Sequence, residues 1–274
     1  MEVIYLDHTS KLKDIEPHVM AIGFFDGVHL GHQELFERAK KHAKANGILC
    51  SALTFSPHPD EVIKGEKNRK YITPLQEKIT KIAQCGIDRL FVMKFDKKFA
   101  SLPPKDFIHT YITGINTNHV VVGFDFTFGC KAQGNTDLLK KISQKGDFGV
   151  TVIPKKTFLN TKIGSTETKR LVYDGNVDLV PHFLGEYYEV HARVKKKFDE
   201  ENVFNVEINR QYILPKQGTY EVRILIDHGT YYGEITIQPN VENELRIDEY
   251  ENPNDQALKI AFLNRLAVKS AVLV

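Results

Sequence analysis

The sequence predicts an α/β protein with a mostly parallel sheet, followed by a smaller antiparallel β domain. Over the first two thirds of the 274 residues, short apolar segments alternate with amphipathic ones. Strand, helix, strand repeated in this way implies right-handed crossovers and parallel strands. From about residue 186, polar and apolar residues alternate within short segments, which is typical of antiparallel hairpins or a small barrel. We therefore expect two domains, 1–185 and 186–274.

Five apolar runs in the first domain predict buried strands, because both faces of a parallel sheet are covered. They lie at 18–25, 48–55, 89–95, 119–126 and 149–154. Apolar residues at helical spacing predict the intervening helices. These lie at 29–45, 74–86, 104–112 and 137–146. The helix at 74–86 begins with Pro74 and ends at Gly86, which are typical residues for a helix start and a helix end.

The second domain is predicted to form a small barrel or a set of hairpins, closed by a last helix. Its expected strands lie at 187–198, 202–208, 219–226, 230–237 and 243–250. Polar residues, glycine and asparagine separate them, as in turns. The apolar spacing at 253–269 predicts the C-terminal helix.

Composition excludes several classes of protein. With 37 Lys and Arg against 35 Asp and Glu, the net charge is +2, so we expect no nucleic-acid partner. The three cysteines form no closely spaced pair, which argues against a disulfide framework and a zinc knuckle. The start of the chain lacks an apolar signal core, and no segment has the roughly 18 to 20 apolar residues that cross a bilayer. We expect a cytoplasmic protein without membrane partners; its oligomeric state has no signal in the sequence.

The segment 23–32, Gly-Phe-Phe-Asp-Gly-Val-His-Leu-Gly-His, carries the strongest functional signal. It follows the first predicted strand and opens the first predicted helix. The N-terminus of a helix at this edge of an α/β sheet offers free N–H groups to phosphate. Its three glycines permit a close backbone approach. His29 and His32 are three residues apart, so both rings can face one side of the helix.

Two imidazoles aimed at a phosphate suit phosphoryl or nucleotidyl transfer. That chemistry needs positioning, and donor or positive groups where charge builds on the phosphate oxygens. One alternative is a tight glycine turn with two incidental histidines. The other is a metal site formed by His29, His32 and Asp26, although no further histidine or cysteine cluster completes it.

The segment 23–32 resembles the His-x-Gly-His signature of the nucleotidylyltransferase superfamily, in the form found in bacterial FAD synthetases. These are usually bifunctional riboflavin kinase/FMN adenylyltransferases. The segment 54–59 is similar to the family's Phe-x-Pro-His-Pro turn, and 122–129 to its Val-Gly-x-Asp/Asn-Phe-x-Phe-Gly stretch. The segment 163–166, followed by Gly175 and Leu184-Gly185, is similar to its Ile-Ser-Ser-Thr stretch and the helical tail behind it. Together these segments cover roughly residues 15 to 188, and they imply a Rossmann-like nucleotidylyltransferase domain.

The resemblance implies roles for particular residues. The catalytic pair is His29 and His32. The nucleotide-binding residues are Gly23, Phe24, Asp26, Gly27, Gly31, Asp125, Ser165, Thr166 and Lys169. The flavin-binding residues are Pro57, His58, Phe126 and Phe128. The substrates are ATP and FMN, and Mg²⁺ bridges the phosphates and keeps several waters rather than taking a dedicated protein site.

Each of the weaker segments also has a purely structural explanation. Ser165 and Thr166 suit the N-terminus of a helix, so their hydroxyls can serve as plain caps. The turn at 57–59 can be rigid without touching substrate. Phe124, Phe126 and Phe128 alternate, so on one strand they face the same side, where core packing competes with flavin contact as the explanation.

Two departures from the family pattern bear on function. Thr127 and Ala132 stand where the family tends to have arginine. Lys169 replaces another arginine: it keeps the positive charge but cannot bind a phosphate through two parallel hydrogen bonds. In the second domain, 191–200 lacks the family's Gly-Arg-x-Leu-Gly-x-Pro-Thr-Ala-Asn loop. We therefore expect FAD and pyrophosphate to be made from FMN and ATP, with riboflavin kinase activity absent or weak. The alternatives are another phosphorylated acceptor, or a regulatory paralogue that binds flavin or nucleotide.

Overall fold

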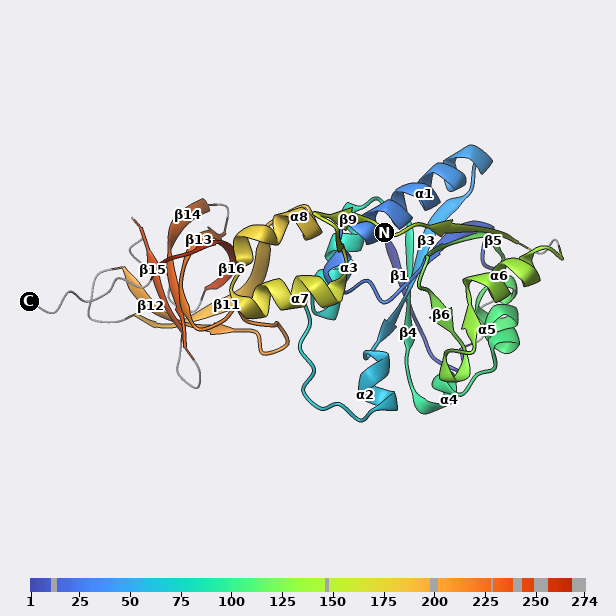
Figure 1. The fold of residues 1–274 in the computed structure, drawn as a ribbon, viewed down its shortest axis with the longest axis horizontal. Coiled ribbons are helices and arrows are strands. Elements are labelled where there is room, and N and C mark those ends of the chain that lie inside the picture. Colours follow the sequence, from blue (N-terminus) through green and yellow to red (C-terminus); the bar gives the residue numbers. More distant parts are fainter. Residues whose placement is uncertain are drawn as a thin grey trace, which may run out of the picture. The chain divides into compact units, whose positions relative to one another are not determined.

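The computed structural model describes residues 1–10, 14–145, 148–197, 202–227, 229–238, 243–248 and 256–267. The chain forms two compact units, shown in Figure 1. The first unit contains Met1–Arg69 and Thr73–Lys162, and the second contains Lys70–Ile72 and Ile163–Val274. The division expected between residues 185 and 186 stays a prediction, because the limits of a compact unit and of a functional domain need not coincide.

The first unit is built on a six-stranded sheet in the order β1-β4-β3-β2-β5-β8, in which every neighbouring pair is parallel. Its strands are β1 Glu2–Leu6, β2 His18–Ile22, β3 Leu49–Ser56, β4 Arg89–Lys94, β5 Thr117–Gly123 and β8 Gly149–Ile153. The predicted parallel α/β sheet is confirmed. Strand β1, at the sheet edge, was not among the strands expected from the sequence.

Helices cover both faces of this sheet. They are α1 Leu30–Asn46, α2 Pro59–Ile63, α3 Leu75–Gln84, α4 Lys97–Ala100, α5 Pro104–Tyr111 and α6 Thr136–Ser143. Successive residues of β2 alternate between the two cores: Val19 packs with residues of α1 and α3, whereas Met20 packs with residues of α5 and α6. This alternation follows from the period of two along a strand. The result is a three-layer arrangement.

The predicted strand at 119–126 ends early, at Gly123. Phe124 and Asp125 form a turn, and the chain then makes a short hairpin from β6 Thr127–Phe128 and β7 Gly134–Asn135. The expected one-sided row of phenylalanines was therefore wrong. Phe124 is 42% exposed, whereas Phe128 is 6% exposed. A turn breaks the alternation on which that expectation depended.

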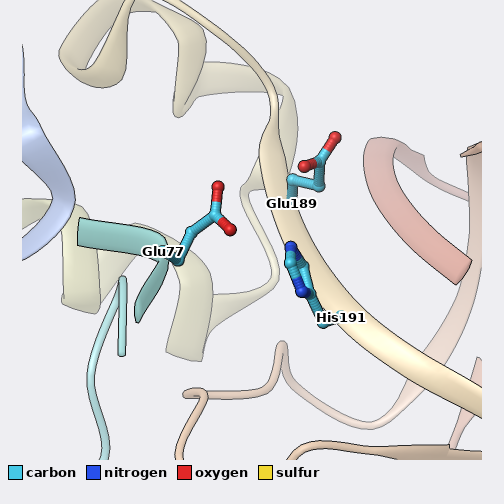
Figure 2. A group of neighbouring side chains, drawn as sticks. All are labelled: Glu77, Glu189 and His191. Carbon is cyan, nitrogen blue, oxygen red and sulfur yellow. The ribbon is translucent and has the colours of Figure 1, made fainter. Parts of the chain in front are cut away.

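The second unit contains helices α7 Ser165–Asp174 and α8 Pro181–Leu184, and a closed antiparallel barrel. Its strands are β11 Tyr188–Lys197, β12 Val203–Ile208, β13 Gly218–Ile226, β14 Gly229–Ile237, β15 Asn243–Ile247 and β16 Ala257–Arg265. Closure in the order β11-β12-β15-β14-β13-β16 confirms the expected small barrel. On β11, Tyr188 and Val190 are buried, while Glu189 and His191 alternate with them and remain partly exposed (Figure 2).

The expected C-terminal helix was wrong over the described residues, because Ala257–Arg265 is strand β16. Leu258, Ile260 and Phe262 are all buried, at a period of two. Strand β16 pairs with β11 on one side and β13 on the other, and so closes the barrel. This tertiary pairing outweighs the local helical preference. Residues 253–255 and 268–269 of the expected helix lie outside the described residues, as do residues 198–200 of the segment without the family's loop.

A short excursion of the chain belongs to the second unit. The Tyr71 N–H donates to the Gln211 carbonyl at 2.8 Å, and the Ile213 N–H donates to the Tyr71 carbonyl at 2.9 Å. The chain returns to the first unit at Thr73. Among the residues described, no helix is long and apolar enough to span a membrane.

Candidate active site

The loop between β2 and α1 follows an unusual backbone path. Phe25 has φ 59°, Gly27 has φ 82° and Val28 has φ 44°. Only glycine adopts positive φ freely, and for the β-branched Val28 this conformation is a genuine outlier. Such residues store on the order of 1–3 kcal/mol each and cluster at functional sites. Surrounding contacts must therefore hold this loop in place.

Three side chains from elsewhere in the first unit hold the loop. The Thr73 backbone N–H donates to Asp26 Oδ1 at 3.1 Å, and the Gly27 N–H donates to Thr73 Oγ1 at 2.9 Å. The Phe24 carbonyl accepts from Thr54 Oγ1 at 2.8 Å and from Lys78 Nζ at 2.8 Å. The Lys78 ammonium also lies 3.8 Å from the centre of the Phe24 ring. Lys78 is 2% exposed, so its charge is held inside the fold beside the loop.

His29 and His32 meet at the start of α1, as the sequence predicted. His29 is the N-cap of the helix, and its Nδ1 accepts from the His32 backbone N–H at 3.2 Å. The two rings are stacked, with centroids 3.5 Å apart and an interplanar angle of 18°. The Phe25 ring meets the His32 ring edge-on, 5.1 Å between centroids. The hydrogen bond at the N-cap, the stacking of the two rings and the contact with Phe25 together fix the orientation of both imidazoles.

Both imidazoles are neutral at pH 7. Burial, reinforced by the charge of Lys162, lowers the pKa of His29 to about 4, although Asp26 and Asp125 oppose the shift. Burial also places the pKa of His32 well below its ordinary value, assisted by His29 and by nearby lysines. Because His29 Nδ1 accepts a hydrogen bond, its proton lies on Nε2, which is then a hydrogen-bond donor.

His32 carries a buried polar atom that has no partner in the part of the chain described, its Nδ1. Buried polar groups in folded proteins are almost always paired, and exceptions concentrate at functional sites. A bound polar ligand or water beside the stacked pair would supply the missing partner. The histidine pair therefore has the character of a binding site.

The turn after β5 brings a further pair of charges. Lys162 Nζ forms an ion pair with Asp125, and it lies 4.8 Å from the centre of the Phe124 ring. The side chains of Lys162 and Asp125 are about half exposed, so solvent reaches both. Lys162 and Asp125 act on the pKa of His29 in opposite directions, which places them beside the histidine pair. Lys162 is free to exchange Asp125 for a phosphate at little cost, since exposed ion pairs contribute only about 0–1 kcal/mol.

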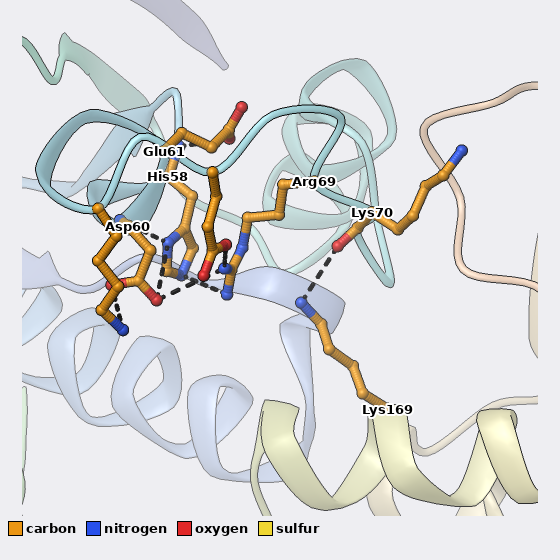
Figure 3. A network of polar contacts seen from close by, with 8 residues as sticks. His58, Asp60, Glu61, Arg69, Lys70 and Lys169 are labelled. Atoms are coloured by element: carbon orange, nitrogen blue, oxygen red, sulfur yellow. Dashed lines mark hydrogen bonds and ion pairs between the residues drawn. The ribbon is translucent and has the colours of Figure 1, made fainter.

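His58 is held in a network of polar contacts (Figure 3). It forms a capping box at the start of α2: its Nδ1 accepts from the Asp60 N–H at 3.0 Å, while the Glu61 carboxylate accepts from the His58 N–H at 3.1 Å. Arg69 lies 3.3 Å from His58 Nε2 and pairs with Asp60 at 3.4 Å. Both ring nitrogens are thus engaged. This geometry favours the rigid-turn explanation, and the His58 ring presents its edge to Phe24, at 4.4 Å between centroids.

Two of the predicted flavin residues occupy different environments. Phe126 packs, partly buried, on the core cluster that contains Phe128. Their rings are stacked at 5.5 Å, and Phe107 packs on Phe128 at 5.3 Å. Phe128 is therefore a core residue of the first unit. Pro57 follows a cis peptide bond next to His58.

Comparison with known proteins decides the family. The FAD synthetase family matches residues 11–167. A bifunctional riboflavin kinase/FMN adenylyltransferase from Listeria monocytogenes is 36% identical over 270 residues, covering 95% of this chain and 82% of its own length. The chain belongs to the FAD synthetase family.

Other relatives indicate the same family. A bifunctional riboflavin kinase/FMN adenylyltransferase from Bacillus subtilis is 35% identical and covers 97% of this chain and 90% of its own length. A second Listeria monocytogenes protein, named FAD synthetase, is 34% identical over 76% of this chain and 82% of its own length. A solved structure described as a macrolide-efflux protein from Streptococcus pneumoniae has a TM-score of 0.87 at 26% identity. The match covers 96% of this chain and 91% of that chain.

Three of the predicted nucleotide-binding residues, Ser165, Thr166 and Lys169, lie on α7 of the second unit. The helix begins at Ser165 with Gly164 as its N-cap, so neither Ser165 nor Thr166 is the capping residue. Thr166 is exposed and Ser165 partly buried. Lys169 Nζ donates to the Lys70 carbonyl at 3.3 Å, within the same unit (Figure 3). Their part in nucleotide binding stays a prediction.

Thr54, Thr73 and Lys78 are the loop-holding residues that sequence reasoning missed. Lys78 had a recognisable signal, because it lies on the apolar face of α3, four residues before the buried Ile82. A lysine on a core-facing position is rare unless its charge is satisfied. Thr54 and Thr73 carried no comparable signal, since a single threonine at the end of a strand or before a helix is common.

The described part of the first unit offers few side chains that could hold a metal ion beside the histidine pair. Within the described residues of the first unit, no three carboxylate, histidine or cysteine side chains gather around one point. Two carboxylates lie beside the histidine pair: Asp26 is buried, and Asp125 is about half exposed. Magnesium commonly takes one or two carboxylates and completes its octahedron with phosphate oxygens and water.

Proposed function

We propose that this chain is an FMN adenylyltransferase that makes FAD and pyrophosphate from FMN and ATP. The observation that carries the proposal is the stacked pair His29 and His32 at the N-terminus of α1, with Nε2 of His29 as donor. A helix N-terminus and two oriented imidazoles suit a phosphate whose charge grows during reaction. Membership of the FAD synthetase family supports FMN as the acceptor.

In the reaction, a phosphate oxygen of FMN attacks the α-phosphorus of ATP. The new P–O bond forms while the bond from the α-phosphorus to the oxygen bridging it to the β-phosphate breaks, and that oxygen leaves with pyrophosphate. His29 and His32 donate hydrogen bonds to the α-phosphoryl oxygens, where charge increases in the transition state. Both rings are neutral before substrate binds, and the approaching phosphates favour their protonated forms.

Other residues position the two substrates. Gly23, Gly27 and Gly31 let the backbone approach the nucleotide. Ser165, Thr166 and Lys169 receive the leaving pyrophosphate. Phe126 lies beside the flavin, and Phe128 supports Phe126 from the core. His58, in the rigid turn that follows Pro57, also helps to position the flavin. Asp125 would hold magnesium together with the phosphates, and the ion would supply neutralisation of phosphate charge.

Riboflavin kinase activity is the second candidate function. The relatives that cover 95% and 97% of this chain are named as bifunctional, and the second unit forms a closed barrel. Against it stands the missing family loop at 191–200. We propose that phosphorylation of riboflavin is absent or weak.

The test is incubation of the purified protein with Mg²⁺, ATP and either FMN or riboflavin, followed by chromatographic separation of the flavins. We expect FAD from FMN, and no FMN from riboflavin. His29→Ala and His32→Ala should each lower kcat by about 10²-fold or more, while His109→Ala, at an exposed position of α5, should not.

Each contrary result has a meaning. Wild-type turnover by both histidine variants would refute the mechanism. Pyrophosphate release with a different phosphorylated compound, and none with FMN, would indicate another acceptor, for which Thr127 and Ala132 are the residues to examine. Binding of flavin or ATP without any pyrophosphate release would indicate a regulatory paralogue.

A further inference from the structure

Thr73 makes a reciprocal pair of hydrogen bonds with the loop that precedes the catalytic histidines. It donates its backbone N–H to Asp26 Oδ1 at 3.1 Å and accepts from the Gly27 N–H through Oγ1 at 2.9 Å. Thr73 and Asp26 are each 2% exposed. Both hydrogen bonds are therefore shielded from water. If either is lost, water cannot replace it.

The bonded residues lie at the most constrained point of the loop. Gly27 has φ 82°, and Val28 next to it has φ 44°. A β-branched residue leaves this conformation unless its neighbours prevent it. The Gly27 N–H is part of the peptide that begins this turn, so fixing that N–H fixes the direction in which the chain enters α1.

The consequence reaches His29, two residues after Gly27. His29 is the N-cap of α1, and its ring orientation depends on the hydrogen bond from the His32 N–H to Nδ1. A change in the direction of entry moves the cap and with it the stacked ring of His32. Small displacements of a catalytic group lower rates strongly, because reacting atoms must be aligned.

We propose, resting on the function proposed above, that Thr73 is a positioning residue for adenylyl transfer: its hydroxyl holds the Asp26–Gly27 turn so that His29 and His32 face the α-phosphate. Thr73 touches neither ring and acts only through the turn. Because the same turn carries Gly27, which is assigned to the nucleotide, loss of the hydroxyl should lower kcat and also raise KM for ATP, whereas KM for FMN changes little.

The test compares Thr73→Val, which replaces the hydroxyl by a methyl group of similar size, with Thr73→Ser, which keeps the hydroxyl. The matched control is Thr117→Val. Thr117 is also 2% exposed, and its hydroxyl pairs with His18 Nε2 at 3.1 Å. It lies at the first residue of β5, the end of the sheet opposite the loop. Both valine variants lose a buried hydroxyl, so both lose stability.

We expect Thr73→Val to lower kcat for FAD formation by about 10- to 100-fold and to raise KM for ATP, with little change in KM for FMN. Thr73→Ser and Thr117→Val should keep the wild-type kcat, measured well below the unfolding temperature of each variant. Thr73→Ala gives a second hydroxyl-free variant if valine prevents folding. An unchanged kcat in the hydroxyl-free variants, or an equal loss in Thr117→Val, would overturn the proposal.

A second readout does not depend on the reaction. Long-range ¹H–¹⁵N spectra of protein with ¹⁵N-labelled histidine report the tautomer of each ring. In the wild type and in Thr73→Ser, His29 should be the Nε2–H form at pH 7, and in Thr73→Val its signals should move or double. If the wild type makes no FAD, the proposed function fails, yet these spectra still decide whether Thr73 orients His29. Unmoved His29 signals in Thr73→Val would reject the positioning role.

Discussion

Gly23 provides a sharp test of how the loop and the histidine pair are connected. A Cβ atom added at this position would lie 2.6 Å from Cε1 of Phe25, which is 0.8 Å short of the 3.4 Å at which ordinary contact begins. Phe25 is fully buried and packs on His32 at 5.1 Å and on Phe36 at 4.8 Å between ring centroids. In Gly23→Ala the Phe25 ring must therefore move by most of an ångström, and it has no free space on its other side.

Two effects follow from that displacement. Overpacking of a filled core costs about 1–3 kcal/mol of folding free energy. A shift of this size at His32 should lower kcat by about 10²-fold. The control is Gly47→Ala at the C-terminus of α1, where φ is 62° and no atom lies within 4 Å of the added Cβ. Its backbone conformation costs roughly 1 kcal/mol for alanine, so stability falls without a steric effect on the site.

The assay measures kcat for FAD formation and the unfolding temperature of both variants under the same conditions. We expect both to unfold earlier than the wild type, and only Gly23→Ala to lose turnover. A Gly23→Ala protein with the wild-type kcat would show that the Phe25 contact does not set the position of His32. An equal loss of kcat in Gly47→Ala would show that turnover simply follows stability.

Three further predictions concern charge around the site. His29 has a folded pKa of about 4 against an ordinary 6.5, so the folded state binds fewer protons than the unfolded state between these values. Stability from this group is therefore complete above pH 6.5 and declines by roughly 3 kcal/mol as pH falls through 4, which an NMR titration of His29 and unfolding at each pH would check. Lys78→Met should lower kcat/KM for FAD formation by about 10-fold or more, whereas Lys81→Met on the same helix should have a smaller effect. Arg69→Ala should release the His58 ring and raise KM for FMN more than it lowers kcat, as steady-state kinetics with FMN varied would measure.

The candidate site could be predicted from the sequence where its signal is local. Segment 23–32 places a strand end, a glycine turn and two histidines within ten residues, so their proximity follows from the chain itself. The parallel sheet was predictable for the same reason, because its strands β2, β3, β4, β5 and β8 are short apolar runs separated along the chain by helices. The spacing of three residues between His29 and His32 then indicated that the rings can share one face of the helix.

The errors arose where contacts between distant segments decide the structure. The segment 257–265 has an apolar spacing that suits a helix locally, yet pairing with β11 and β13 makes it a strand. The strand at 119–126 has the composition of a strand up to Phe126, but the turn at Phe124 and Asp125 ends it. Thr73 acts on Gly27 across 46 positions of sequence, and no local pattern specifies that meeting.

The loop also explains why a short motif is insufficient to build this site. Phe25 and Val28 have positive φ and carry strain, which contacts with other parts of the fold must offset. The compensating bonds come from Thr54 at the end of β3 and from Thr73 and Lys78 at the start of α3. Two neighbouring parts of the fold are therefore required before the stacked histidines take their positions. We therefore expect a protein that kept segment 23–32 but lost these supports to retain the signature and lose the geometry.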